Sequence, residues 1–265
     1  MSIPSGAAAA GDRKKVALLY HELRPQGSAY SYVLPCARFE QQLRMMAELP
    51  ATSYEPIVTF DDGHVSNYTY ALPALEASGR SAFFFITAGW TGVRPDYMDK
   101  TQLRALHTAG HGIGAHGWTH TLLTQCSAAD LRHELVDARS ALEDAIGAPV
   151  TSLSLPGGRS NAAVIEACHE AGYTTVWTSV PGAVKSSSEA TVGRFNILAG
   201  HSDAFLQRLL DPASGELARA ARVGRWKAMA QRVMGDAAYA RLWALLNRKE
   251  GDATDPGAQR VDGAL

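Results

Sequence analysis

Short apolar runs alternate with segments of helical periodicity along most of the chain, and this alternation limits the folds it can adopt. The runs are rich in β-branched and aromatic residues, as in 81–87 (SAFFFIT), and are typical of strands buried on both faces. Strands alternating with helices form the repeating unit of parallel β/α folds. We therefore predict an α/β fold, a distorted (β/α)7–8 barrel with a C-terminal helical extension. The predicted strands lie at Val16, Ile57, Ser81, Ile113, Ser152, Thr174 and Val192.

The length of 265 residues suits one catalytic domain, because it is close to the size of an eight-fold barrel and to the limit of a single core. We predict that the barrel spans 16–210. A disordered N-terminal segment is expected at 1–15, and helices packed on the barrel at 211–250. The segment 251–265 is polar and contains Gly and Pro, which predicts a flexible tail.

The charge balance argues against one class of partner. Lys and Arg number 25 and Asp and Glu 26, a formal net charge of −1, so nothing in it favours binding to nucleic acid. Cys36, Cys126 and Cys168 are far apart and do not predict a disulfide framework. The N-terminal residues lack the order of a secretory signal, and no run has the length of a membrane helix. We expect a cytoplasmic protein that can be peripheral to the inner membrane.

Two adjacent carboxylates end the strand predicted at Ile57. In the segment 59–63 (TFDDG), Asp61 and Asp62 follow the strand, and Gly63 permits a sharp turn after them. Neighbouring side chains of an extended chain point to opposite sides, so one acid can bind a metal while the other transfers protons. An Asp-Asp-Gly surface turn is the alternative interpretation.

A pair of histidines follows the strand predicted at Ile113. His116 and His120 are four positions apart, a spacing that brings two imidazoles to one side of a helical turn. With one carboxylate they make a two-histidine, one-acid set that leaves coordination positions open for water and substrate. An iron oxygenase uses the same ligand types, but the second acid and the β/α pattern favour a hydrolase.

These four side chains fall at the carboxyl ends of predicted strands, which form one rim in a parallel barrel. A divalent ion held by Asp62, His116 and His120 lowers the pKa of its bound water to about 7 and polarises a carbonyl. Asp61, beside this cation, stays ionised at neutral pH and can accept the proton of the water. The residues therefore predict metal-assisted hydrolysis with Asp61 as the general base.

The same residues resemble the motifs of the polysaccharide deacetylase family, the NodB-like carbohydrate esterases. TFDDG matches the first motif of that family, and His116-x-x-x-His120 is similar to the second. The resemblance covers about 16–210 and implies Asp61 as base, with Asp62, His116 and His120 as ligands of Zn²⁺ or another divalent metal such as Co²⁺ or Ni²⁺. It implies removal of acetyl groups from N-acetylated sugars of a polysaccharide or its lipid-linked precursor, and some segments look like members associated with bacterial exopolysaccharide biosynthesis.

The third motif departs from the family pattern. The family places an arginine two residues before the proline and an aromatic residue after it, whereas Ser154 and Gly157 flank Pro156 in this chain. Arg159 is the nearby candidate to orient the base. By the resemblance, Pro156, Gly157, Arg159 and Trp177 are expected at the substrate. Trp177 resembles a tryptophan of the pocket wall, and simple core packing is its alternative role.

The general acid is open between two histidines. The last motif of the family supplies a histidine that protonates the leaving amine, and the segment 198–201 (LAGH) is similar to it. His201 is therefore the first candidate. It can equally belong to the first turn of the helix predicted at 202–210, and His21, which ends the first predicted strand, is the second candidate.

The segment 219–248 is rich in Ala and Arg and carries apolar residues such as Trp226 and Trp243. It predicts two helices packed on the barrel or, alternatively, a surface for a membrane or an anionic glycan. For the whole chain the leading hypothesis is a deacetylase of N-acetylated saccharides. A non-catalytic glycan-binding or scaffold protein that keeps the metal site is the alternative, but metal binding alone does not require Asp61.

Overall fold

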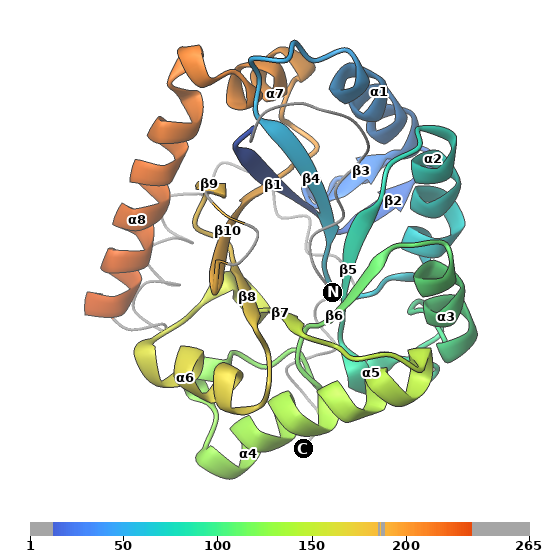
Figure 1. Cartoon of the computed structure of the whole chain (residues 1–265), viewed down its shortest axis with the longest axis vertical. Coiled ribbons are helices and arrows are strands. Elements are labelled where there is room, and N and C mark those ends of the chain that lie inside the picture. The colour runs from blue at the N-terminus through green and yellow to red at the C-terminus, as the bar shows by residue number, and fades with distance from the viewer. Residues whose placement is uncertain (1–12, 185, 187–188, 235–265) are drawn as a thin grey trace.

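The computed structural model describes residues 13–184, 186 and 189–234, and these form a closed parallel barrel surrounded by helices (Figure 1). The last barrel strand pairs with the first, which closes the sheet and confirms the predicted barrel. A short strand, β9 (Ala183–Val184), runs antiparallel to β1 at its amino end. In spatial order the seven parallel strands are β1 (Lys15–Tyr20), β4 (Glu55–Phe60), β5 (Ala82–Ile86), β6 (Gly112–Ala115), β7 (Ser152–Ser154), β8 (Thr175–Thr178) and β10 (Thr191–Asn196).

The sequence of β6 shows why these runs become barrel strands. All four of its residues are buried, and two of them are glycines facing aromatic rings of β5. A Cβ on Gly112 would lie 2.4 Å from a ring atom of Phe83, and one on Gly114 would lie 2.5 Å from a ring atom of Phe85. The large residues of β5 therefore fill the space that β6 leaves, which is how a small barrel reaches a dense interior.

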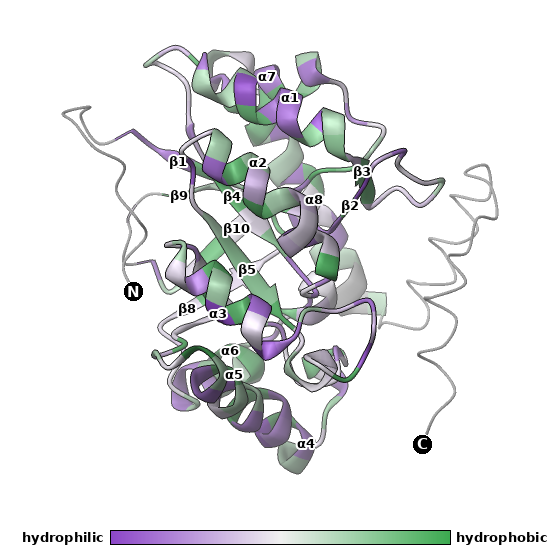
Figure 2. Ribbon diagram, turned by 90° about the vertical axis from the view of Figure 1, so that its right-hand side faces the viewer, coloured by the Kyte–Doolittle hydropathy of each residue, from purple (hydrophilic) through white to green (hydrophobic). Residues whose placement is uncertain are grey.

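Helices cover the outside of the barrel with their apolar sides facing the strands (Figure 2). Side chains cap several of their N-termini, among them Asp99, Ser127, Asn161 and Ser202. The helices are α1 (Cys36–Ala47), α2 (Leu72–Ala77), α3 (Lys100–Thr108), α4 (Ala128–Arg132), α5 (Ala138–Ile146), α6 (Ala162–Glu170), α7 (Asp203–Leu210) and α8 (Glu216–Met234).

The segment 127–146 has the amphipathic pattern of one helix, but a π-helical turn, η4 (His133–Asp137), separates α4 from α5. A second π-helical turn, η1 (Asn67–Ala71), precedes α2. The wider turn of η4 carries a buried glutamate, Glu134, and such π turns are frequent next to functional sites.

The loop predicted after β1 contains two further strands. β2 (Glu22–Arg24) and β3 (Val33–Pro35) pair in parallel outside the barrel, so the segment 25–32 projects between them. These strands are too short to show periodicity, which is why the sequence suggested only a loop. The predicted segments 1–15 and 251–265, and the second half of 219–248, lie wholly or mostly outside the described residues.

Within the part of the chain that the structure describes, no helix combines the length and the apolar character that crossing a bilayer requires.

Candidate active site

Asp61 and Asp62 follow directly after β4, at the carboxyl end of the barrel, as predicted. Asp61 is 3% exposed and its N–H donates to the carbonyl of Tyr20 at 3.1 Å, which continues the pairing of β4 with β1. The chain then turns, because Asp62 and Gly63 both have positive φ values of 72° and 82°. A left-handed backbone is strained for a residue with a Cβ. The turn directs the carboxylates of Asp61 and Asp62 to different partners.

His116 and His120 approach each other through a loop and not through a helical turn, so that detail of the prediction is wrong. His116 follows β6, and the residues from His116 to His120 contain no helix. Positive φ values at Gly117 (75°) and His120 (69°) fold the loop back on itself, so that the two ring centroids are 4.9 Å apart. The two histidines are therefore close together, as predicted, but because of the loop conformation and not because of a helical turn.

Asp62, His116 and His120 form a group that can hold a metal ion, with their ligand atoms all within 4.8 Å of one another. The Nε2 atoms of both histidines lie 3.4 Å from Oδ1 of Asp62. Zinc bonds of about 2.0–2.1 Å in tetrahedral geometry place two ligand atoms roughly 3.3–3.4 Å apart. The observed separations fit a zinc-sized ion.

Two further contacts support the fit. Oδ1 of Asp62 is buried and has no hydrogen-bond partner among the described residues, as expected of an atom arranged for a cation. His116 donates from Nδ1 to the carbonyl of Ser154 at 2.9 Å, which leaves the lone pair of Nε2 facing Asp62. A second hydrogen bond of this kind orients most metal-binding histidines.

The pKa values of this group reflect the crowding of opposite charges. Burial raises the pKa of Asp62, but the two imidazoles facing it outweigh burial and hold that pKa well below its usual value. For His116, burial lowers the pKa, but the carboxylates of Asp61 and Asp62 outweigh burial and leave the pKa above its usual value. Both acids therefore favour a positive charge at this position, which a proton or a metal ion can supply.

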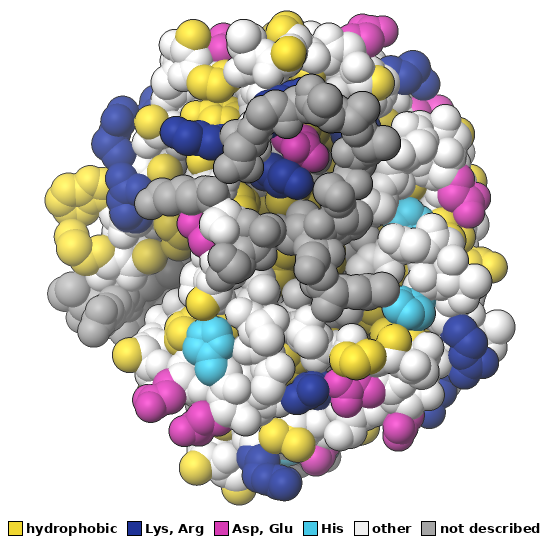
Figure 3. Space-filling model, viewed as in Figure 1, with side chains coloured by type: hydrophobic (Ala, Val, Ile, Leu, Met, Phe, Trp, Pro, Cys, Tyr) yellow, Lys and Arg dark blue, Asp and Glu magenta, His cyan; other side chains and the backbone are white. Residues whose placement is uncertain are grey.

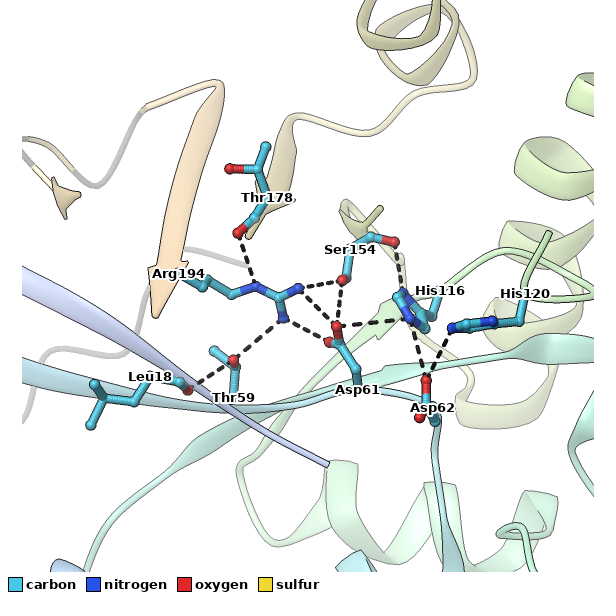
Figure 4. A network of polar contacts seen from close by, with 9 residues as sticks. All are labelled: Leu18, Thr59, Asp61, Asp62, His116, His120, Ser154, Thr178 and Arg194. Carbon is cyan, nitrogen blue, oxygen red and sulfur yellow. Dashed lines mark hydrogen bonds and ion pairs between the residues drawn. The ribbon is translucent and has the colours of Figure 1, made fainter. Parts of the chain in front are cut away.

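Asp61 is held by a cation that the sequence analysis did not identify (Figure 4). Arg194 of β10 is fully buried and donates two hydrogen bonds, from Nη1 to Oδ1 at 2.7 Å and from Nη2 to Oδ2 at 2.8 Å. Ser154 joins the pair, because its hydroxyl donates to Oδ2 of Asp61 at 2.9 Å and accepts from Nη2 at 2.6 Å. Arg194 also contacts Thr59 and the carbonyl of Thr178.

This arrangement explains the departure in the third motif. Ser154 stands where the family pattern has an arginine, and a small side chain there leaves room for the guanidinium of Arg194 from another strand. The structure thus places the guanidinium of Arg194 on the carboxylate of Asp61, the position for which Arg159 was the candidate. The signal available in the sequence was an arginine in the middle of an otherwise strand-like run, VGRFN, since a buried arginine requires a partner.

The pKa of Asp61 follows from the same contacts. Burial raises it, but the guanidinium of Arg194 and the imidazole of His116 outweigh burial and bring the pKa below its usual value. Oδ2 of Asp61 is 3.8 Å from Nε2 of His116, so this ionised carboxylate lies directly beside the group that can bind a metal.

A cavity of about 280 Å³ opens over these residues. His21 lines it, and its Nδ1 is buried without a hydrogen-bond partner among the described residues. Burial lowers the pKa of His21, against the opposing effect of Asp62 and Asp61. The complete lining is Leu19, His21, Tyr30, Tyr32, Asp61, Asp62, His116, His120, Leu155, Gly157, Gly158, Ser179 and Asn196.

Tyr30 and Tyr32 of this lining come from the segment between β2 and β3, and the sequence analysis missed both. The ring of Tyr32 lies edge-on to His21, with centroids 4.8 Å apart, and Tyr30 lies 5.5 Å from Tyr32. The tyrosine-rich loop itself was visible in the sequence. Its position over the cavity depends on the unpredicted pairing of two three-residue strands.

Four predicted site residues do not line the cavity, and Gly157 does. Pro156, which precedes Gly157, is buried. Trp177 is 1% exposed and packs 5.3 Å from Phe83 in the core, its alternative role. Arg159 is also outside the lining. His201 stacks on Phe205 with centroids 4.8 Å apart.

His201 is also engaged on its other side. Its Nδ1 accepts the N–H of Leu198 at 3.1 Å, and its carbonyl accepts a hydrogen bond from Arg38 at 2.6 Å. These contacts fix the entry to α7, the alternative considered for this residue. Of the two candidate acids, the structure places only His21 at the cavity.

Comparisons with known proteins agree with this geometry. Residues 54–176 match the family model described as polysaccharide deacetylase. A peptidoglycan-N-acetylglucosamine deacetylase of Bacillus cereus is 30% identical over 129 residues, which are 49% of this chain and 58% of that protein. A chitin deacetylase of Pestalotiopsis is 26% identical over 136 residues, 51% of this chain and 45% of that protein. The chain thus spans about half the length of the curated relatives it matches.

Solved structures show the same fold. The deacetylase PplD of Streptococcus pyogenes, in complex with acetate, superposes with a TM-score of 0.66 and 21% sequence identity, covering 75% of this chain and 99% of that one. At such identity the likeness concerns the fold alone. The match over 54–176 and the TFDDG and His-x-x-x-His segments, set on a barrel of the same fold, support assignment to the polysaccharide deacetylase family.

Proposed function

We propose that the protein is a metal-dependent hydrolase that removes acetyl groups from N-acetylated sugars of a polysaccharide or its lipid-linked precursor. One observation carries the proposal: Asp61, kept ionised by Arg194, lies 3.8 Å from a histidine of the Asp62, His116 and His120 group. A proton acceptor directly beside a metal-binding group is what amide hydrolysis requires. The names of the relatives, which act on peptidoglycan and chitin, support N-acetylated amino sugars as the substrate class.

A bound divalent ion, for which we propose Zn²⁺ with Co²⁺ or Ni²⁺ as substitutes, would lower the pKa of a water molecule and polarise the acetyl carbonyl. Asp61 then accepts the proton of the attacking water, and its two hydrogen bonds to Arg194 hold the carboxylate in place. Gly157, at the cavity wall, offers a backbone N–H for the developing oxyanion.

His21 is our proposed general acid. An amine leaves slowly unless it is protonated, so the reaction needs a donor on the cavity wall. The buried Nδ1 of His21 has no partner among the residues that the structure describes, and a proton on this ring can pass to the leaving nitrogen. Burial lowers the pKa of His21, which favours release of the proton to the amine.

The orienting contact of Arg194 also bears on the non-catalytic alternative. That alternative depended on the loss of the arginine of the third motif. In this chain Arg194 and Ser154 bind both oxygens of Asp61, and a protein that only binds glycans has no need to orient this acid. The contact therefore favours the enzyme.

Acetate release from N-acetylated chito-oligosaccharides and peptidoglycan fragments tests the proposal, with metal-free and Zn²⁺-loaded protein compared. We expect Asp61→Asn to keep metal binding and lose activity by at least about a hundredfold, the usual range for a general base. Asp137→Asn is the matched control, because Asp137 is an exposed acid that pairs only with His133 among the recorded ion pairs. Metal binding without turnover on any of these substrates would favour the glycan-binding alternative.

A further inference from the structure

Glu134 is a buried carboxylate whose recorded hydrogen bonds all go to the loop between the two metal-binding histidines. It is 3% exposed. Oε2 accepts the N–H of Trp118 at 2.7 Å and the N–H of Thr119 at 3.0 Å, and Oε1 accepts the hydroxyl of Thr119 at 2.5 Å. All three donors belong to Trp118 and Thr119, which lie between His116 and His120 in the sequence.

The loop is fixed from both sides. Its amides point to Glu134, whereas the carbonyls of Gly117 and Trp118 accept the N–H groups of Ala88 and Gly89 at 3.0 and 2.9 Å. Glu134 also comes so close to the backbone that a Cβ on Gly117 would lie 2.7 Å from Oε2. The carboxylate therefore occupies the concave side of the loop and specifies its curvature.

The hydrogen bonds from Glu134 stabilise a loop conformation that is unfavourable by itself. His120 has a φ of 69°, and a left-handed backbone is unfavourable for a residue with a side chain. Such strain persists only where the surrounding structure determines the conformation. Burying the charge of Glu134 is in turn tolerable only when the loop presents its N–H groups, so each stabilises the other.

We propose that Glu134 is a positioning residue that holds the loop from His116 to His120 ready for a metal ion before the ion binds. It does not touch the ion and acts through the two histidines. The inference rests on the metal site of the proposed function and adds a residue from a different element, the π-helical turn η4.

Metal affinity tests this inference without relying on activity. Purified apo protein is titrated with Co²⁺ and followed by its absorption, and Zn²⁺ affinity is measured by competition with a chelator. Glu134→Gln keeps the size of the side chain but turns an N–H₂ group toward the loop amides, so we expect Co²⁺ and Zn²⁺ to bind about 10 to 100 times more weakly. The measurements are made well below the unfolding temperature of each variant.

Glu143→Gln is the matched control. Glu143 of α5 also accepts a backbone N–H, from Val150 at 3.0 Å, and a hydrogen bond from Arg139. Because none of its hydrogen bonds to the described residues goes to the loop, this variant should lose some stability and keep its metal affinity within about twofold, below the range for metal-supporting residues. If Glu134→Gln is destabilised but binds both metals as the wild type does, the positioning role is wrong. If the wild type itself binds neither metal, it is the proposed function that fails.

A separate observation concerns α8, which combines exposed apolar side chains with positive charge. Its first half packs on the barrel through Leu217 and Ala221, which are 5% and 8% exposed. The five consecutive residues from Arg225 to Met229 are all exposed, so every side of the helix is uncovered there. The exposed apolar side chains are Val223 (45%), Trp226 (67%), Met229 (51%) and Met234 (40%).

After Glu216 in the first turn, the charges on this helix are all positive. No acid occurs from Leu217 to Met234, and the basic residues are Arg219, Arg222, Arg225, Lys227 and Arg232, although the whole chain has a formal net charge of −1. Figure 3 shows basic and hydrophobic side chains together at the edge where Figure 1 places α8. A helix with exposed tryptophan and methionine, and with only positive charges after its first residue, matches the chemistry of an interfacial helix.

We infer that α8 docks on an anionic lipid surface, with Trp226 at the level of the headgroups and the arginines beside the lipid phosphates. Charge complementarity selects this occupant over a second copy, because two copies of α8 would bring positive charges together. A soluble anionic polymer would account for the arginines but not for the exposed Trp226 and Met229.

Sedimentation of the full chain with vesicles tests this docking. We expect binding to vesicles of phosphatidylcholine with phosphatidylglycerol, weak binding to phosphatidylcholine alone, and loss of binding at high salt. Removing two charges in Arg222→Gln/Arg225→Gln should weaken binding about 25-fold, since one cation near a charged surface contributes about 1 kcal/mol, roughly fivefold. Trp226→Ser should also weaken it.

Val93→Ser is the control for α8, because Val93 is a 76% exposed apolar residue away from the helix. It should bind the vesicles as the wild type does. Absence of binding to the anionic vesicles, or binding that is unchanged in both α8 variants, would overturn the inference. So would a concentration-dependent dimer that Trp226→Ser abolishes, since the apolar face would then belong to a second copy.

Discussion

Replacing Arg194 by methionine should strongly destabilise the barrel. Arg194 and Asp61 are 0% and 4% exposed in their side chains, and the variant leaves the carboxylate buried without its cation. Removing one partner of a buried ion pair costs about 3–5 kcal/mol. For a domain of this size, about 2–4 °C per kcal/mol converts this to a fall in Tm of roughly 6–20 °C. Urea and thermal unfolding of the metal-free protein at pH 7 measure it.

The pH dependence of this loss identifies its cause. In the wild type the pKa of Asp61 is below its usual value, so the pair stabilises the fold above about pH 4 and this contribution is lost as the pH falls through the folded pKa. In Arg194→Met, burial without the guanidinium raises the pKa of Asp61, and protonation of Asp61 then removes the unpaired buried charge. The difference in unfolding free energy between wild type and variant should therefore be largest at neutral pH and narrow toward pH 4.

Double substitution separates the ion pair from packing. Arg194→Met/Asp61→Asn removes both charges, so its cost should be well below the sum of the two single costs. Arg44→Met is the control, because Arg44 is 67% exposed and its loss should change stability by less than about 0.5 kcal/mol. A loss below about 1 kcal/mol in Arg194→Met, or one that does not change with pH, would refute the view that this pair is a strong buried interaction.

Three further outcomes are expected. His21→Ala should lower kcat about 10²–10⁴-fold, whereas His201→Ala should keep kcat and lose stability, because His201 packs on Phe205; kcat values in the reverse order would contradict the assignment. Ser154→Ala should cost about 1–3 kcal/mol in urea unfolding, because both Asp61 and Arg194 lose a hydrogen bond, and a neutral effect would contradict it. Dialysis against a chelator should abolish acetate release and Zn²⁺ should restore it, except in Asp62→Asn; activity that survives the chelator would exclude a metal-dependent reaction.

The sequence predicted those parts of the site that depend on neighbours in the chain. Asp61 and Asp62 follow a recognisable strand, and His116 follows another, so parallel pairing of β4, β5 and β6 brings them to one rim. His116 and His120 were predicted to lie close together, and they do, even though the segment between them is a loop and not a helix. Local spacing limits which side chains can meet but does not fix the backbone between them.

Contacts between distant elements were not predictable in the same way. Arg194 reaches Asp61 only because β10 pairs with β1 and closes the barrel, and 133 positions separate the two residues. Glu134 lies within a helix whose periodicity gave no sign of a π turn. The choice between His21 and His201 depended on which strand end faces the cavity, and no local pattern encodes that direction.

Because the last strand closes the barrel, the site can be complete only after β10 has been synthesised. The matched family region, 54–176, contains Asp61 and the group of Asp62, His116 and His120, but neither His21, which follows the first barrel strand, nor Arg194, which lies in the last one. A nascent chain released at position 180 would contain these acids and imidazoles without the guanidinium of Arg194, which binds Asp61. We expect such a fragment to be inert, and a separately supplied peptide of the missing C-terminal part to restore turnover if the two pieces reassemble.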